Sequence, residues 1–130
     1  MFRSVVCAAF TILVSFTPAF AQECLHGPNE SAVERERREY AIRVARQINA
    51  LQAAWIGANP RSGQYARLSQ LKLPDMPDDF GLMFHLDGRR YTFSLKDDRD
   101  PCYFAIFSDH DGLIYAAMPQ QEQRAADQPR

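Results

Sequence analysis

Apolar residues in the first half of the chain recur every three or four positions, which is the spacing of one face of an α-helix. They are Val33, Tyr40, Val44, Ile48, Leu51 and Trp55. Just before them, Ser31 and Glu34 have the spacing of a capping box, in which the two side chains satisfy free amides of the first turn. The pattern predicts a long N-terminal amphipathic helix that begins after Ser31 and ends before Gly57.

The opposite face of this predicted helix is densely charged. Glu34 with Arg38, and Glu39 with Arg43, are oppositely charged pairs four residues apart. Each such pair contributes only about 0.2–0.5 kcal/mol to helix stability. We interpret the charges as a solvated face, and a binding surface is the alternative.

Residues 57–79 lose the helical period and are rich in glycine, proline, asparagine and aspartate. A short helical piece is predicted from Tyr65 to Leu71, where apolar residues can share one face. Pro74 and Pro77 end it, because proline lacks the amide N–H that a regular element needs. This segment is predicted to pack as an irregular linker.

After residue 79 apolar and polar residues alternate, as in strands with one buried face. Strands are predicted at 80–86 and 91–96, joined by Asp87-Gly88, which is typical of a two-residue hairpin turn. Two more strands are predicted at 102–108 and 113–118. Four strands joined in this order form an antiparallel meander. With the helix packed on its apolar face, the result is a two-layer α+β domain.

The N-terminus has the three parts of a cleavable secretory signal. Arg3 supplies the positive charge, and residues 5–16 form an apolar run shorter than the ~20 residues that cross a bilayer. Residues 19–21 are Ala-Phe-Ala, a cleavage-site pattern. We therefore expect residues 1–21 to be removed and the protein to be secreted or periplasmic, without a membrane span. A retained membrane anchor is the alternative.

The remaining chain is long enough for one core, so residues 22–118 are predicted to form a single domain. Residues 119–130 are polar apart from alanine and proline, and we expect a disordered tail. Without Arg3 the chain has fourteen basic and sixteen acidic residues, a formal charge of −2. This balance argues against a nucleic-acid partner and against binding to an anionic membrane surface.

Two cysteines remain after the predicted cleavage, Cys24 near the new N-terminus and Cys102 late in the chain. An oxidising compartment would pair them. We interpret the pair as a structural disulfide that closes a long loop. A redox-active pair is the alternative, although such cysteines usually lie close together in sequence.

The order of a helix, a loop with Gly63-Gln64-Tyr65-Ala66 and an antiparallel meander resembles the headgroup of type IV pilins and type II secretion pseudopilins. The amino-acid sequence of the predicted helix from Arg46 to Gln52 is also similar to that of the helix in these families. The resemblance covers roughly residues 32–118. The chain lacks the prepilin leader and the apolar half-helix that holds a filament together. The resemblance therefore implies a detached, soluble pilin-like head.

Motifs for catalysis are absent. None of the serines lies in a glycine-flanked elbow with a histidine and an acid nearby, so we expect no enzyme activity and no cofactor. His26, His85 and His110 do not have the spacing of metal ligands, and we expect no metal site. The weak alternative is a calcium site, for which the carboxylates are Asp97, Asp98 and Asp100, together with Asp109 and Asp111 if the two loops converge.

The predicted third strand is apolar on both faces, with Tyr103 and Phe107 on the side opposite Phe104. Either residues 57–79 cover that second side, or it is a partner-binding patch with Arg89 and Arg90 as rim contacts. We expect a secreted, non-enzymatic module that binds an envelope protein or another envelope component. The alternative is a small periplasmic inhibitor or hydrolase-type protein whose site combines the two arginines with the acids at 97–100.

Overall fold

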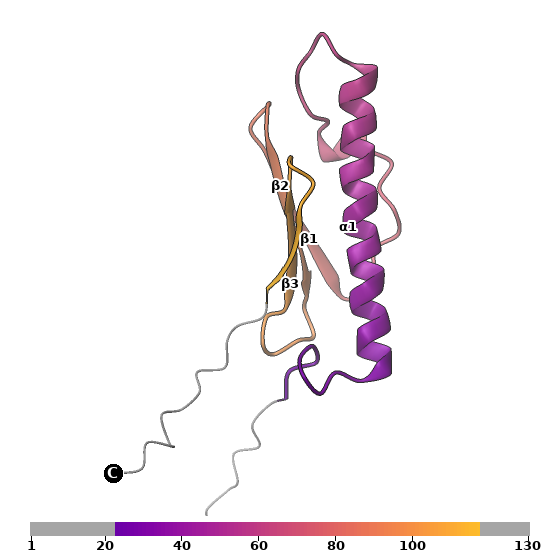
Figure 1. The fold of residues 1–130 in the computed structure, drawn as a ribbon, viewed down its shortest axis with the longest axis vertical. Helices are drawn as coiled ribbons and strands as arrows, with labels where there is room; N and C mark the ends of the chain where they lie inside the picture. The colour runs from indigo at the N-terminus through magenta and orange to yellow at the C-terminus, as the bar shows by residue number, and fades with distance from the viewer. Residues whose placement is uncertain (1–22, 118–130) are drawn as a thin grey trace, which may run out of the picture.

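The computed structural model describes residues 23–117, which form one helix packed on one face of a four-stranded antiparallel sheet (Figure 1). The predicted α+β class and the meander are confirmed. The expected signal at 1–21 and the expected tail at 119–130 lie outside the described residues. Within 23–117, no helix has the combined length and apolar character needed to cross a membrane.

Helix α1 (Ala32–Ala58) begins where the capping pattern predicts and ends two residues later than expected. Ser31 Oγ accepts a hydrogen bond of 3.2 Å from the amide of Glu34. The helix is not N-terminal, which corrects the sequence interpretation, because residues 23–31 precede it as an ordered loop. The residues of α1 that are buried follow the helical period and are Ala41, Val44, Ala45, Ile48 and Gln52.

The sheet consists of β1 (Phe80–Leu86), β2 (Tyr91–Asp97), β3 (Ala105–Asp109) and β4 (Ile114–Ala117), in the order β1-β2-β3-β4. β1 has the predicted bounds. β3 starts three residues later than predicted, because Cys102 lies in a turn and Tyr103 has a left-handed φ of 56°. A residue in that conformation cannot continue a strand.

The hairpin turn between β1 and β2 is centred one residue later than expected. The amide of Asp87 donates to the carbonyl of Arg90 at 3.1 Å, so Gly88 and Arg89 are the two central residues. Gly88 has φ +87°, a conformation that glycine adopts without steric cost.

The core lies between α1 and the inward face of the sheet. Leu95, Ile106 and Phe104 are almost fully buried there, against Val44 and Ile48 of the helix. α1 contacts β3 and β4. The helical layer is extended over β2 by the linker, whose Tyr65 ring packs edge-on against Tyr91 with centroids 4.7 Å apart.

The linker contains one short 3-10 helix, η1 (Leu68–Gln70), in place of the longer helical piece predicted from Tyr65 to Leu71. It is attached to α1 by side-chain hydrogen bonds to its backbone. Gln52 bonds to Ala66, and the hydroxyl of Tyr40 donates to the carbonyl of Asp75. The prediction that this segment packs as an irregular linker is therefore confirmed.

Candidate functional site

The face of the sheet that points away from α1 carries a continuous row of side chains across all four strands. Backbone pairing places Met83 opposite Ser94, Ser94 opposite Phe107, and Phe107 opposite Tyr115. Neighbouring residues in a strand point to opposite faces, and Phe93, Leu95 and Ile106, which are next to these residues in β2 and β3, are buried in the core. We call Met83, Ser94, Phe107 and Tyr115 the open-face row.

Three members of the open-face row are large, apolar and exposed. The exposed fraction is 71% for Met83, 45% for Phe107 and 55% for Tyr115. Together with neighbouring side chains they border a shallow hollow of about 500 Å³. Exposed apolar side chains that gather on one face of a domain can mark an interaction surface.

The linker does not cover this face. Its contacts are with α1, with the β1–β2 turn and with the inward ring of Tyr91, which places it on the helix side of the sheet. The interpretation that residues 57–79 shield the second side of the third strand is therefore wrong. The interpretation failed because apolar residues in an irregular segment have no regular spacing. The sequence of such a segment therefore does not indicate which face of the sheet it packs against.

Two of the four residues predicted to bind a partner lie together. Phe107 belongs to the open-face row. Tyr103 is 68% exposed in the β2–β3 connection, and the Nζ atom of Lys96 lies 5.0 Å from its ring centroid. Since Lys96 points to the same side as Ser94, Tyr103 borders the open face at this end.

The other two predicted residues, Arg89 and Arg90, lie in the β1–β2 turn, at the far end of β2 from Tyr103. Both are exposed. Among the described residues, neither guanidinium group takes part in an ion pair. They lie at one end of the sheet, and in the described domain no acidic side chain forms an ion pair with either of them.

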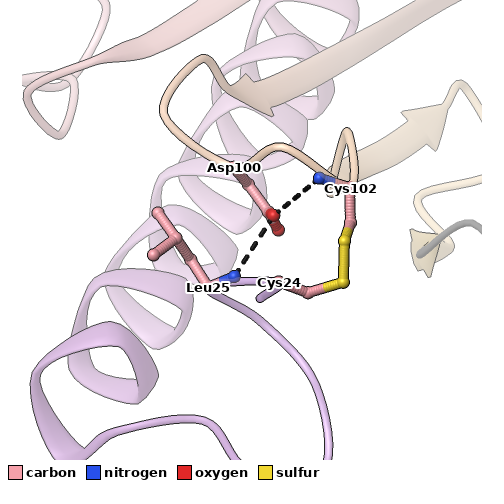
Figure 2. The surroundings of a disulfide bond; sticks show 4 residues. All are labelled: Cys24, Leu25, Asp100 and Cys102. Carbon is pink, nitrogen blue, oxygen red and sulfur yellow. Dashed lines mark hydrogen bonds between the residues drawn. A yellow bond between two sulfur atoms is a disulfide. The ribbon is translucent and has the colours of Figure 1, made fainter. Parts of the chain in front are cut away.

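Cys24 and Cys102 form the predicted disulfide, which joins positions 78 residues apart (Figure 2). Asp100, only 3% exposed, lies beside it. Its Oδ1 atom accepts hydrogen bonds from the amides of Leu25 at 3.2 Å and Cys102 at 2.9 Å. One carboxylate thus ties the N-terminal loop to the β2–β3 connection next to the covalent link.

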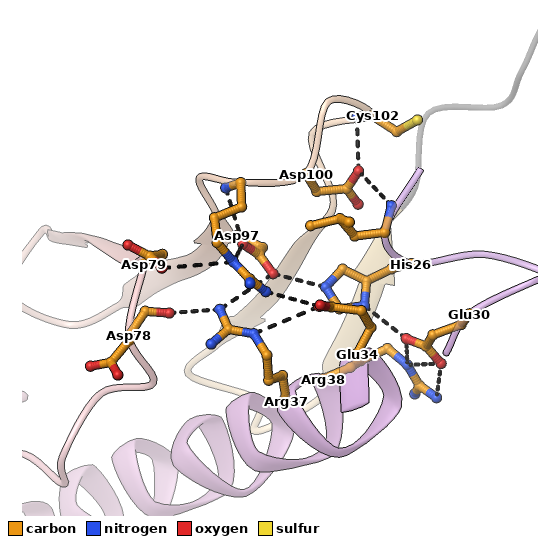
Figure 3. Close-up of polar contacts among 12 residues, drawn as sticks. His26, Glu30, Glu34, Arg37, Arg38, Asp78, Asp79, Asp97, Asp100 and Cys102 are labelled. Atoms are coloured by element: carbon orange, nitrogen blue, oxygen red, sulfur yellow. Dashed lines mark hydrogen bonds and ion pairs between the residues drawn. The ribbon is translucent and has the colours of Figure 1, made fainter. Parts of the chain in front are cut away.

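His26 lies in the same loop and is buried between two carboxylates (Figure 3). Its Nδ1 is 2.7 Å from Glu30 Oε1, and its Nε2 is 2.9 Å from Asp97 Oδ2. Its ring also packs on Phe104, with centroids 4.4 Å apart. No role for His26 was predicted from the sequence, since Asp97 is 71 residues away and no local pattern connects the two residues.

Arginines surround these carboxylates and complete a charged cluster at this end of the molecule (Figure 3). Arg38 forms hydrogen bonds of 2.9–3.2 Å to Glu30, and Arg99 donates to Glu34 at 2.9 Å. Burial opposes ionisation of Asp97, but hydrogen bonds from His26 and Arg99 outweigh it and lower the pKa of this carboxyl. For Glu30, burial is likewise outweighed by hydrogen bonds from Arg38 and His26, and its pKa is also lowered.

The three acids of the alternative calcium site have separate partners. Asp97 faces His26 and Arg99, Asp98 is directed to Lys96 at 3.7 Å, and Asp100 accepts from backbone amides. In the described domain, Asp109 and Asp111 lie at the opposite end of β3 from these acids.

His26, Glu34 and Asp97 offer three ligand atoms within 4.8 Å of one another, a spacing that a metal ion could use. Two guanidinium groups already occupy this position. Arg99 Nη2 lies 2.9 Å from Glu34, and Arg37 Nη2 lies 3.7 Å from Asp97. The two carboxylates of this group therefore already have cationic partners within the protein.

The alternative inhibitor or hydrolase site combined Arg89 and Arg90 with the acids at 97–100. These groups lie at opposite ends of β2, whose seven residues span roughly 20 Å. The structure does not bring them into one site, because a strand separates residues that the sequence places only a few positions apart.

Comparisons of the chain with protein-family models, with curated proteins and with solved structures find no match.

Proposed function

We propose that this protein is an exported, non-enzymatic binding module that docks a protein of the cell envelope on its open sheet face. The observation that carries the proposal is the open-face row, in which Phe107 and Tyr115 are exposed opposite each other on paired strands and Met83 is exposed on the other side of Ser94. Burying such side chains against a partner is favourable by about 25 cal/mol per Å² of apolar surface removed from water.

Charge at the ends of this face defines the chemistry of the partner. Arg89 and Arg90 lie unpaired at the turn end, and Lys96, which is 3.7 Å from Asp98, lies near the other end beside Tyr103. Cations that border an apolar strip favour a partner surface with an apolar centre and carboxylates around it. We therefore commit to an acidic-rimmed protein surface as the occupant.

The pilin-like part of the proposal is supported by the order of elements. A long helix, an irregular loop containing Gly63–Ala66 and a four-stranded meander follow one another as in pilin headgroups. The disulfide is compatible with the oxidising compartment that export would provide. On this view the domain is a detached headgroup whose sheet contacts another envelope protein.

Photo-crosslinking from the open face tests the proposal. A photoreactive phenylalanine analogue in place of Phe107 should link the protein to one envelope partner in intact cells. The same analogue in place of Val33, which is 66% exposed in the first turn of α1, is the matched control and should not yield that product.

Two variants then test the chemistry of contact. Tyr115→Asp should abolish the crosslinked product, and Arg89→Glu with Arg90→Glu should weaken it and make it less sensitive to salt. Equal products from positions 107 and 33, or a product that survives Tyr115→Asp, would remove the open face as the docking surface.

A further inference from the structure

A second hollow lies where α1 ends, between its last turn, the following loop and the β1–β2 turn. It has a volume of about 550 Å³ and shares no lining residue with the hollow on the open face. This volume falls in the range of roughly 300–1,000 Å³ that small-molecule sites occupy. The cleft is therefore a separate candidate site, independent of the docking surface proposed above.

A buried glutamine shapes this cleft. Gln52 is fully buried, and its amide forms two hydrogen bonds of 2.9 Å with Ala66, one to the carbonyl and one from the N–H. Fixing Ala66 also fixes Tyr65 and Arg67 on either side of it, both of which line the cleft. The amide of Tyr65 donates in addition to the carbonyl of Gly88 at 3.2 Å. These hydrogen bonds fix this side of the cleft in the absence of a ligand. A preformed cleft lowers the entropic cost of binding.

The lining combines aromatic rings with neutral hydrogen-bonding groups. Trp55 and Tyr65 provide half-buried rings, while Asn59, Gln64 and Gln70 provide amides. The Asn59 NH₂ group already donates to the carbonyl of Trp55 and the Gln70 side-chain oxygen accepts from the amide of Arg67, so the other atom of each amide is the one left for a ligand. A purely apolar ligand would desolvate these amides without replacing their bonds to water. A sugar fits both features, because its C–H face packs on an aromatic ring while its hydroxyls bond to amides at the ring edge.

Charge narrows the class of sugar. Arg67 is the charged residue among those that line the cleft, and in the described part of the chain its guanidinium forms no ion pair. No carboxylate lines the cleft to repel an anion. A guanidinium in this setting favours a ligand carboxylate, with which it can form two parallel hydrogen bonds.

We propose that this cleft binds a short acidic oligosaccharide, with a sugar ring against Trp55, hydroxyls on the amides and a carboxylate on Arg67. Trp55 is the only tryptophan of the chain, so its fluorescence reports directly on the cleft. Titration of the purified protein with trigalacturonic acid should give a saturable change in emission. The neutral trimer of N-acetylglucosamine should bind about tenfold more weakly, since it lacks the charge-assisted bond.

Variants at matched positions complete the test. Arg67→Gln should lower the affinity for trigalacturonic acid to about that of the neutral trimer. Arg61→Gln, an exposed arginine of the same loop outside the cleft lining, should leave it unchanged. Both residues are exposed, so circular dichroism should show the same fold for both variants.

Three results would overturn the proposal. One is the absence of a saturable change with the acidic trimer at millimolar concentration. A second is equal loss of affinity in Arg61→Gln and Arg67→Gln, which would indicate diffuse charge attraction. The third is unchanged affinity of Trp55→Phe measured by calorimetry, which would place the sugar elsewhere.

Discussion

His26 is buried between Glu30 and Asp97, and both of its ring nitrogens face carboxylate oxygens. Its surroundings come from a loop, a helix and the end of a strand, which meet only in the folded chain (Figure 3). For this reason no reading of local sequence could find the cluster.

The lowered pKa values of Glu30 and Asp97 predict a loss of stability in acid. Unfolded carboxyl groups titrate near pH 4, and the folded groups titrate lower. Their contribution is complete above the unfolded values and is lost as pH falls through the folded values. The free energy of unfolding, measured in urea, should therefore decrease from about pH 5 towards pH 2.

Two substitutions separate this effect from the general charge of the protein. Asp97→Asn should cost roughly 3 kcal/mol at pH 7, because it removes a buried negative charge that pairs with Arg37 and Arg99, and should flatten the dependence on pH. Asp98→Asn, at an exposed neighbouring carboxylate, should keep the wild-type slope. Identical slopes in the two variants would contradict a role for the buried cluster.

Only part of the open-face row could be predicted from the sequence. Phe107 was found, together with Tyr103 at the border of the face, because the predicted third strand is apolar on both faces. Met83 and Tyr115 were not singled out, since each is one apolar residue in an alternating strand. They become a site only through the register that aligns them with Ser94 and Phe107.

At the scale of elements, periodicity predicted α1 and all four strands, because each buries one face against the other layer. The boundaries differ where the fold imposes a local conformation. β3 begins at Ala105, after the disulfide and the left-handed Tyr103 have turned the chain. The linker could not be placed at all, since single hydrogen bonds such as Gln52 to Ala66 position it.

The start of α1 gives a prediction at this scale. Ser31→Ala removes the hydroxyl that accepts from the Glu34 amide, and should lower the free energy of unfolding by about 1 kcal/mol. Ser69→Ala is the control, because in the described part of the chain the Ser69 side chain forms no hydrogen bond. Chemical denaturation measures both. A loss below the experimental error for Ser31→Ala would show that water replaces the cap.

For the whole molecule, the disulfide is the contact that encloses the longest stretch of chain in the described domain. It joins residues 78 positions apart and closes a loop that contains α1, β1 and β2. Replacing both Cys24 and Cys102 by serine should lower the free energy of unfolding by about 4 kcal/mol. This loss comes mainly from the larger freedom of the unfolded chain. Denaturation of the oxidised protein, of the reduced protein and of the double variant measures it.

Thiol titration of the purified, denatured protein provides the control. It should find Cys24 and Cys102 unreactive until a dithiol reductant is added. Reaction of both sulfurs without reductant would contradict the presence of the disulfide. A double variant as stable as the oxidised protein would contradict its contribution to the free energy of unfolding.

The position of the same covalent link also determines how the domain would respond to a mechanical load. A force applied between residue 23 and residue 117 would pass from Cys24 directly to Cys102, bypassing the helix, the linker and the first two strands. Only β3 and β4 would lie on the loaded path. A domain anchored at both ends would therefore extend by unfolding β3 and β4, while the loop closed by the disulfide would not lengthen.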